Sequence, residues 1–463
     1  MKKISDNKEI QKVFDLFEEI NRIPRESKNE KKIIDFLVDY SQNKGWKTEK
    51  DKVGNLLVTV TTDSKDFVCL QSHVDMVCVK RTDSLHDFSK NAVELMETNG
   101  YLASKNGTTI GADNGVGVVL SLVLAENKEI PNLELLFTVD EETGLNGARN
   151  LNLNLKSKTL INLDSDKEGA FFIGCAGAID FKATYDLNYF ENKEIGYELS
   201  VCDLPGGHSG TCIHENHRVN AILLAIRVLL LLDDTRLVSI DGGQVRNSIP
   251  KSCVVKFVSS KNTDEIIEVL IAKQKQYPEL NFNLKETEVN KSLSKNQTDK
   301  LLKTLFALPS NVTEISNTIS NLIQTSCNFG TIKTEDDFLE IGYLLRSSNQ
   351  YSLEKYFHKV KCLLELGDFN FEILSKYNGW LPNLESRIVK ISKEAFTERY
   401  NKEPEFSSIH AGIECGLFIS KFPEIDTISL GPNILNAHSP EERVEIKSVE
   451  STCLLLKKIL EKL

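Results

Sequence analysis

Histidine and carboxylate residues stand directly after three runs of apolar residues in this chain. They are His73 and Asp75 in LQSHVD, Glu141 and Glu142 in FTVDEETG, and Asp164 in INLDSD. The apolar runs before them have the length and composition of buried strands. Because the carboxyl ends of strands in an open α/β sheet meet along one edge, where ligands bind, we expect the three clusters to converge.

Two further residues extend this set. Asp113 in GADNG stands where a glycine-rich turn enters a predicted helix, and His438 in GPNILNAHSPEE precedes the last predicted helix. Several charged groups at the ends of buried strands would repel one another and lose hydration, a cost that metal ions can offset. Two histidines and three carboxylates form a suitable ligand set for a pair of zinc ions (Zn2+), and Co2+ or Mn2+ suit the same ligand types to overlapping degrees.

The charge of such a ligand set indicates the chemistry. Three anionic ligands against two divalent cations leave one positive charge, which favours a bridging hydroxide over water near neutral pH. Asp113 is the best candidate for a carboxylate that both metals share. Taken singly the clusters are weak signals, since a pair of glutamates usually lies in a solvated turn. Their joint placement is what favours a metal centre.

Two other kinds of catalytic site are disfavoured. A nucleophilic-serine elbow, G-x-S-x-G, would need glycine at position 211, but GGHSG is followed by threonine there: the segment reads GGHSGT, with Thr211. The ten cysteines include no C-x-x-C pair, which argues against a thiolate zinc site and against a redox motif. We expect them to be small core residues in a reducing cytoplasm.

Length and charge exclude several classes of protein. A chain of 463 residues is too long for one hydrophobic core, so two domains, or one domain with a large insertion, are expected. The 56 basic and 67 acidic residues give a net charge of −11, which would repel nucleic acid.

The N-terminus lacks the apolar core of a signal peptide. The longest apolar stretch, residues 221–232, is broken by Arg227 and predicts a buried helix, because a membrane span needs roughly 20 apolar residues. We expect a soluble, cytoplasmic protein with neither nucleic acid nor membrane as a partner.

Helices and strands alternate in the N-terminal part of the chain. Apolar spacing predicts helices over residues 10–20 and 33–40, strands over 55–60, 67–70, 133–139 and 159–163, and a helix after GADNG. This order predicts an α/β fold whose mixed sheet has some parallel pairing and is flanked by helices. A changed pattern predicts an inserted α+β domain at residues 186–377, between the two parts of a catalytic domain, 1–185 and 378–463.

Motifs along most of the chain resemble those of a known family. The matching segments are NRIPRES, LQSHVDMVCVK, LHDF, GTTIGADNGVGV, LLFTVDEETG, INLDSD, IGCAG, GGHSG, VRNSIP, QTSCNFG, LLRSS, IHAGIECG and GPNILNAHSPEERVEI. The chain is similar to the aminoacyl-histidine dipeptidases (peptidase D, Xaa-His dipeptidases), within the wider family of two-zinc aminoacylase-like metallopeptidases. Residues 255–320 match little, and Lys167 stands where the family usually carries further acidic residues.

The resemblance implies roles for the polar clusters. The implied metal ligands are His73, Asp113, Glu142, Asp164 and His438. Asp75 would brace His73, as carboxylates behind a metal-binding histidine do. Glu141 would be the general base, which takes a proton from the bridging water and delivers it to the leaving amine. Asp164 is favoured as the ligand over Asp166, which we expect at the surface.

Three residues of the inserted domain are candidates for substrate binding by the same resemblance. His208 in GGHSG would stabilise the oxyanion of the tetrahedral intermediate. Asn247 would contact the substrate, and Arg346 would pair with its terminal carboxylate. An isolated arginine more often lies on a solvated face, so for Arg346 that alternative stays open.

The remaining histidines lack a comparable context. We expect surface or hydrogen-bonded structural positions for His86, His214, His217, His358 and His410. For His410, in the glycine-flanked segment IHAGIECG, a place in the substrate pocket is an open alternative.

These expectations describe a zinc-dependent dipeptidase of the Xaa-His type, acting through a metal-bridged hydroxide with Glu141 as general base. The resemblance also implies that the inserted domain is a lid and mediates homodimerisation. One alternative keeps the metal site but makes the chain a broader di- and tripeptidase or an N-acyl amino acid deacylase. Another is a non-catalytic zinc-containing binding protein, against which the intact ligand set and Glu141 argue.

Overall fold

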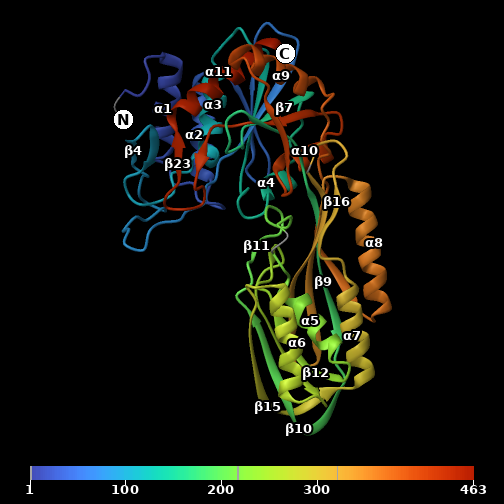
Figure 1. Ribbon diagram of the computed structural model, residues 1–463. Coiled ribbons are helices and arrows are strands. Elements are labelled where there is room, and N and C mark those ends of the chain that lie inside the picture. Colours follow the sequence, from blue (N-terminus) through green and yellow to red (C-terminus); the bar gives the residue numbers. More distant parts are fainter. Residues whose placement is uncertain (1–2, 216–217, 321) are drawn as a thin grey trace. The chain divides into compact units, whose positions relative to one another are not determined.

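The computed structural model describes residues 3–215, 218–320 and 322–463, which form two compact units (Figure 1). Unit 1 consists of Met1–Gly174, Pro382–Ser408 and Ile413–Leu463, and unit 2 of Cys175–Leu381 and Ile409–Gly412. Unit 1 is therefore built from both ends of the chain, and unit 2 is almost entirely one insertion between them. The sequence placed the borders of this insertion at residues 186 and 377.

A mixed eight-stranded sheet forms the centre of unit 1. Its strand order is β1-β2-β6-β3-β7-β21-β8-β20. The strands are β1 Lys47–Lys50, β2 Leu56–Val60, β3 Phe67–His73, β6 Asn132–Thr138, β7 Thr159–Asn162, β8 Ala170–Cys175, β20 Glu405–Ile409 and β21 Asp426–Ser429. Strands β6, β3, β7 and β21 pair in parallel, whereas β1, β2 and β8 pair antiparallel with their neighbours. The predicted mixed α/β fold is thus confirmed.

Helices pack on this sheet. They are α1 Lys8–Ile20, α2 Lys31–Asn43, α3 Ala112–Leu124, α4 Asn146–Arg149, α9 Arg387–Tyr400, α10 Glu414–Lys421 and α11 Ile446–Lys462. Helix α3 is buried along nearly its whole length, packs on β3 and is covered by α1 and α11. Strand β6 is buried at every residue and β3 at all but its first. Burial on both faces explains why these strands read as continuous apolar runs, as central parallel strands do.

A small second sheet in unit 1 joins distant segments of the chain. Its order is β22-β23-β5-β4, with β4 Leu95–Thr98, β5 Tyr101–Ser104, β22 Ile434–Leu435 and β23 Arg443–Glu445. Strand β23 pairs antiparallel with β5, so the loop between β22 and β23 is anchored to the segment that leads into α3. His438 lies in this loop.

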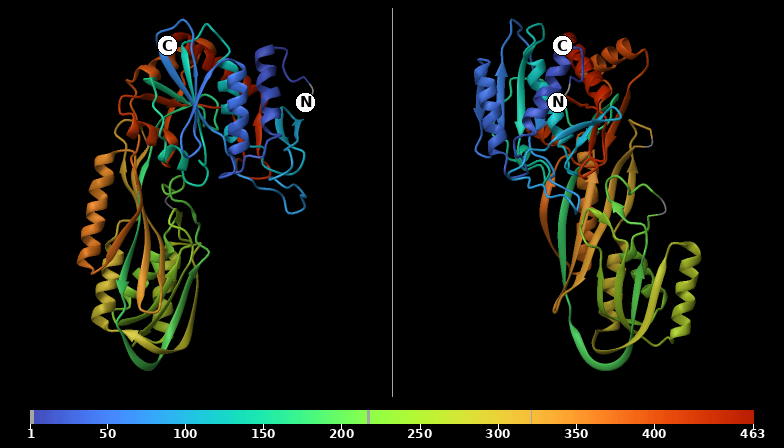
Figure 2. Two further views of the ribbon diagram at one scale, coloured as in Figure 1. Left: turned by 180° about the vertical axis from the view of Figure 1, so that it is seen from behind. Right: turned by 90° about the vertical axis from the view of Figure 1, so that its left-hand side faces the viewer.

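Unit 2, drawn mainly in green to orange in Figure 2, is built around a large sheet. The sheet has nine strands, and the described pairs of neighbouring strands are antiparallel. Its order is β15-β10-β14-β12-β17-β18-β9-β19, with β16 beside β17. The strands are β9 Gly177–Asp186, β10 Tyr189–Cys202, β12 Thr235–Gly242, β14 Cys253–Ser259, β15 Asn281–Leu293, β16 Asn311–Ile315, β17 Ile323–Thr334, β18 Phe338–Ser347 and β19 Asn370–Tyr377. A separate two-stranded ribbon pairs β11 (Gly207–His208) with β13 (Ser248–Ile249).

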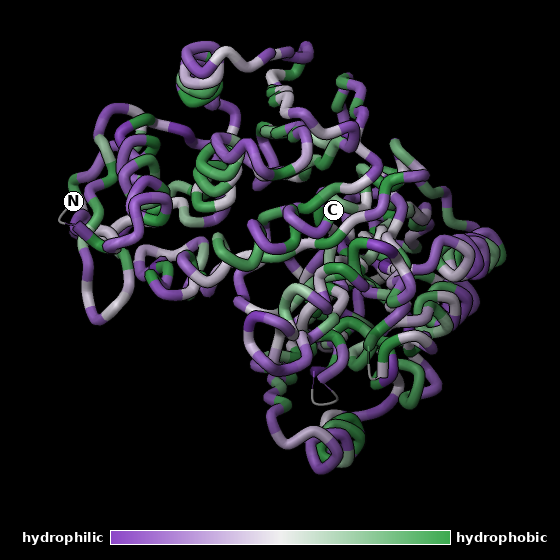
Figure 3. Tube along the Cα trace, turned by 90° about the horizontal axis from the view of Figure 1, so that it is seen from above, coloured by the Kyte–Doolittle hydropathy of each residue, from purple (hydrophilic) through white to green (hydrophobic). Residues whose placement is uncertain are grey.

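The helices of unit 2 are α5 Ala221–Leu231, α6 Thr263–Gln276, α7 Lys295–Ala307 and α8 Gln350–Leu366. Helix α5 contributes seven residues to the buried core, which confirms the buried helix predicted at residues 221–232. Hydrophobic and hydrophilic stretches interchange along the trace (Figure 3). In the described ranges, every helix is too short or too polar to cross a membrane.

Candidate metal centre

The three polar clusters lie at the carboxyl ends of adjacent parallel strands. Strand β3 lies between β6 and β7 and pairs in parallel with both. His73 is the last residue of β3, Glu141 and Glu142 follow β6 after a short turn, and Asp164 follows β7. The convergence expected from the sequence therefore results from this strand order.

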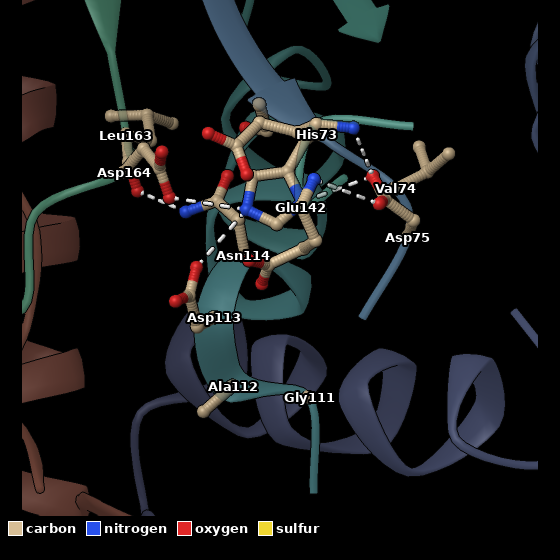
Figure 4. A network of polar contacts seen from close by, with 12 residues as sticks. His73, Val74, Asp75, Gly111, Ala112, Asp113, Asn114, Glu142, Leu163 and Asp164 are labelled. Atoms are coloured by element: carbon tan, nitrogen blue, oxygen red, sulfur yellow. Dashed lines mark hydrogen bonds and ion pairs between the residues drawn. The ribbon is translucent and has the colours of Figure 1, made fainter. Parts of the chain in front are cut away.

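Asp113 reaches the same edge from the first turn of α3. Gly111 precedes the helix with φ of 58°, a left-handed conformation that favours glycine. The peptide between Asp113 and Asn114 is cis. The Asn114 amide donates to the carbonyl of Leu163 at 2.6 Å, which fixes the start of α3 against the segment that carries Asp164 (Figure 4).

The two oxygens of Asp113 face two different histidines. Oδ1 lies 3.0 Å from Nε2 of His73, and Oδ2 lies 3.2 Å from Nε2 of His438. Asp164 approaches the first imidazole at 3.3 Å, and Glu142 approaches the second at 3.0 Å. Two donor groups result, each with ligand atoms within 4.8 Å of one another, and Asp113 belongs to both.

Asp75 stands behind the first histidine. Its Oδ1 lies 3.3 Å from Nδ1 of His73 (Figure 4). Its Oδ2 accepts the hydroxyl of Ser27 at 2.8 Å. The same carboxylate accepts the backbone N–H groups of Glu141 and Glu142. Burial works to raise the pKa of Asp75, but the contacts with His73, Ser27 and the Glu141 N–H outweigh it and lower the pKa to about 2. Asp75 therefore presents a stable negative charge to the imidazole.

Negative charge is concentrated at this edge of the sheet. Burial raises the pKa of the Glu141 carboxyl well above its usual range; His73 opposes this effect, while Asp164, Glu414 and Glu142 add to it. Glu141 also lies within 4.8 Å of His73 and Glu142, counted between side-chain donor atoms. The Glu141 carboxylate is thus placed directly beside the two sets of candidate metal ligands.

The ligand candidates show the same shortage of positive charge. Burial and the charge of Asp113 raise the pKa of Asp164 to about 8, against the pull of His73. Hydrogen bonds to Asp113 and Glu142 raise the pKa of His438 to about 10. Divalent cations would supply the missing charge, and imidazole nitrogen with carboxylate oxygen is a donor set that zinc accepts. The residues present therefore fit a pair of metal ions.

A layer of buried polar side chains underlies the centre. Gln71 donates to the carboxylate of Glu414 at 2.5 Å, and Thr138 donates to it at 2.9 Å. Gln71 also accepts the amide of Asn162 at 2.6 Å. All four side chains are fully buried, and burial raises the pKa of Glu414 to about 7.

Sequence reasoning missed this layer, although a signal was present. Gln71 and Asn162 each stand two residues before a ligand candidate, His73 and Asp164, in strands that are otherwise largely apolar. Since alternate residues of a strand share a face, Gln71 lies on the same face of β3 as His73. Glu414, at the start of α10, gave no comparable signal.

The substrate-binding candidates lie in unit 2. His208 is the second residue of β11, Arg346 is a buried residue of β18, and the backbone of Asn247 accepts the N–H of Ser209 at 2.8 Å. Burial lowers the pKa of His208, and the Arg346 charge lowers it further. His410 shares this neighbourhood, since burial, Arg346 and His208 lower its pKa to about 3. Its Nε2 lies 2.7 Å from the hydroxyl of Ser326.

The other sequence candidates are placed as follows. Asp166 is exposed, as expected. His86 is buried, with its ring edge-on to Phe88, while His214 and His358 are exposed. His217, for which a structural role was expected, lies outside the described residues.

Comparison with known proteins shows similarity over nearly the whole chain. The family model described as "Peptidase family M20/M25/M40" matches residues 69–462. The cytosol non-specific dipeptidase of Escherichia coli (strain K12) is 33% identical, with 98% of each chain covered. The crystal structure of aminoacylhistidine dipeptidase from Vibrio alginolyticus matches with a TM-score of 0.88 at 31% identity, covering 98% of this chain and 96% of that one. A tripeptidase from Staphylococcus aureus shares the fold, with a TM-score of 0.62 at 16% identity and 98% of each chain covered.

Proposed function

Because the chain belongs to peptidase family M20/M25/M40, we propose that it hydrolyses dipeptides at the metal centre of unit 1. Two relatives that are 33% and 31% identical to it over almost their full lengths are named as dipeptidases. One observation carries the proposal: the two carboxylate oxygens of Asp113 face one histidine each, His73 and His438. This is the arrangement that a carboxylate shared by two metal ions requires.

Five side chains would hold two zinc ions. Asp113 would bridge them, with His73 and Asp164 on one side and Glu142 and His438 on the other. Bound ions would supply positive charge that polarises the peptide carbonyl and makes a water molecule more acidic, and cobalt or manganese would serve in a similar way. A solved M20 peptidase from Bacillus subtilis is described as dinuclear metal binding, which agrees with a pair of ions here.

Glu141 would act as the general base. Its carboxylate lies beside the donor groups, and burial raises its pKa, so it is well suited to take a proton from the attacking water. The same proton would then pass to the leaving amine. The backbone N–H of Glu141 is bound by Asp75, which keeps the base in register with His73.

Three residues of unit 2 remain candidates for binding the substrate. His208 would donate a hydrogen bond to the oxyanion of the tetrahedral intermediate, Arg346 would pair with the terminal carboxylate of the peptide, and Asn247 would contact the substrate. The lowered pKa of His208 supports a neutral imidazole, which can donate one hydrogen bond without carrying charge.

The range of substrates is open between two possibilities. One relative is named for aminoacyl-histidine substrates and the other is named non-specific. We propose dipeptides as the substrate class, with Xaa-His among them, in the cytosol and with a homodimer as the working form. A broader di- and tripeptidase, or an N-acyl amino acid deacylase, would use the same metal site.

Hydrolysis of a substrate panel tests this function. Dipeptides, tripeptides and N-acyl amino acids are compared before and after chelation, and again after zinc, cobalt or manganese is restored. We expect dipeptides to be cleaved fastest, and turnover to vanish on chelation and return with metal. Cleavage of N-acyl amino acids but not of dipeptides would instead support the deacylase. No turnover of any substrate with any of the three metals would contradict the proposal that the protein is an enzyme. A molecular mass of one chain in light scattering would contradict the proposed homodimer.

A further inference from the structure

Two buried charged residues beside the metal centre have no part in the chemistry described so far. Arg25 follows α1 and Glu442 precedes β23, and each side chain is only 2% exposed. Charged residues are rarely buried unless they are paired or hydrogen-bonded. Neither was singled out from the sequence, although they stand in NRIPRES and in NAHSPEERVEI.

Glu442 binds the start of α3 through four backbone N–H groups. Its Oε2 accepts from Ile110 at 2.7 Å and Gly111 at 3.0 Å, and its Oε1 accepts from Ala112 at 2.8 Å and Asp113 at 3.4 Å. A carboxylate is favoured here because the first N–H groups of a helix lack partners within the helix and carry partial positive charge. Glu442 therefore fixes the backbone of Asp113 to the loop that carries His438, four residues earlier.

Arg25 binds the same turn from its carbonyl side. One guanidinium nitrogen, Nη2, donates to the carbonyl of Gly111 at 2.7 Å. The other, Nη1, donates to the carbonyls of Val74 at 3.2 Å and Asp75 at 3.4 Å, which directly follow His73. A Cβ atom at Gly111 would lie 2.3 Å from Nη2, so this close approach also requires glycine at that position.

Each of the two charged side chains binds a different side of Gly111, Glu442 its N–H and Arg25 its carbonyl. Burial lowers the pKa of Arg25, and the charge of Glu442 works against that effect. Together they connect the three separate segments that carry His73, Asp113 and His438. Buried charges with only a general role in stability would not need to bind the backbone of these turns in particular.

We propose that Arg25 and Glu442 are positioning residues that hold the turns of His73, Asp113 and His438 in the geometry for binding metal. This inference rests on the proposed metal centre. Its consequence is that either residue, without touching a metal ion, sets the affinity of the centre for metal. Residues that orient metal ligands typically change metal affinity roughly 10- to 100-fold when they are replaced.

The test measures zinc affinity of the full-length protein by competition with a chromogenic chelator. In E442Q the amide replaces one acceptor oxygen by a donor, so two of the four backbone N–H groups lose their partner. In R25K the ammonium keeps the charge but lacks the planar fork that reaches two turns at once. We expect the zinc dissociation constant to rise roughly 10- to 100-fold in each variant, with a matching loss of the zinc-induced rise in Tm.

Glu134 provides the matched control. It is a buried carboxylate, 1% exposed, that accepts the backbone N–H groups of Lys156 and Ser157, and it binds no ligand-bearing turn. We expect E134Q to lower the Tm of metal-free protein while zinc affinity stays at the wild-type value. If E442Q does not fold, E442D keeps the charge on a shorter side chain and is expected to weaken zinc binding in the same way.

Two outcomes would overturn the inference, and they differ. Wild-type protein that binds about two zinc ions, together with folded Glu442 and Arg25 variants of unchanged affinity, would refute the positioning role alone. Wild-type protein that binds no zinc would refute the metal centre and the positioning role together.

Discussion

The carboxylate of Asp75 accepts the backbone N–H of Glu141 at 3.1 Å. The two residues belong to different turns, one after β3 and one after β6, and the parallel pairing of these strands brings the turns together. Asp75 thus orients His73 with its side chain and positions the proposed base through the main chain of Glu141. In the proposed mechanism, ligand orientation and proton transfer would therefore both depend on one buried carboxylate.

Replacing Asp75 by Asn should impair both functions. The amide retains one acceptor oxygen, but its NH2 group would face a backbone N–H or the imidazole. We expect kcat/KM to fall roughly 10- to 100-fold or more. Steady-state kinetics checks this, with D166N as the control, because Asp166 lies two residues from Asp164 but is exposed. Equal activity of D75N and D166N would contradict the bracing role.

Replacing Glu141 by Gln should remove turnover while metal stays bound. The amide has nearly the same size but cannot take up a proton, and general acid–base catalysis contributes typically 10²- to 10⁴-fold to rate. Metal content is measured beside kcat on the same sample. E142Q is the comparison, since it should lose metal as well as activity. An E141Q enzyme with normal kcat would refute the assignment of the base.

Replacing Gln71 by Leu should destabilise unit 1. The change removes the donor to Glu414 and to the Thr138 hydroxyl, and the acceptor for the amide of Asn162, so three buried polar groups lose a partner. Each such loss costs about 1–3 kcal/mol, and more where the group is charged. Urea denaturation followed by circular dichroism measures the change, with Q42L as the control, because Gln42 is exposed. Equal stability of the two variants would show that the polar layer has no structural role.

His410 should make the protein sensitive to mild acid. Burial and nearby positive charges lower its pKa from 6.5 to about 3, so the folded protein holds the ring neutral while the unfolded chain binds a proton below pH 6.5. Its stabilising effect is therefore complete above pH 6.5 and is lost as the pH falls toward 3. We expect about 2 kcal/mol of this loss between pH 8 and pH 5.

Comparison of H410Q with wild type isolates this effect. The Tm of H410Q should fall less between pH 8 and pH 5 than that of wild type. H358Q, which alters an exposed histidine, should retain the wild-type dependence. An identical pH dependence in H410Q and wild type would contradict the neutral, buried state.

Much of the centre could be predicted from the sequence because its residues follow the ends of apolar strands. The convergence of His73, Glu142 and Asp164 followed from the rule that parallel strands end at one edge, whereas their roles as ligands were implied by the family resemblance. The apolar stretch at residues 221–232 likewise predicted the buried helix α5, because it is interrupted by Arg227 and is too short to span a membrane.

Other features depend on pairing that is not visible in one sequence. The order β6-β3-β7 places β3 between strands that follow it in the chain, and short apolar runs carry no signal for this order. Arg25 and Glu442 bind backbone groups of residues far away in the chain, and isolated arginine and glutamate residues usually lie at the surface. Their burial, rather than their type, reveals their role.

Anomalous diffraction at the zinc edge, on crystals grown with zinc, tests the central claim most directly. We predict two anomalous peaks in unit 1 with the Asp113 carboxylate between them. His73 and Asp164 should contact one peak, and Glu142 and His438 the other. Two peaks bound by other residues, or none beside Asp113 at saturating zinc, would contradict the account.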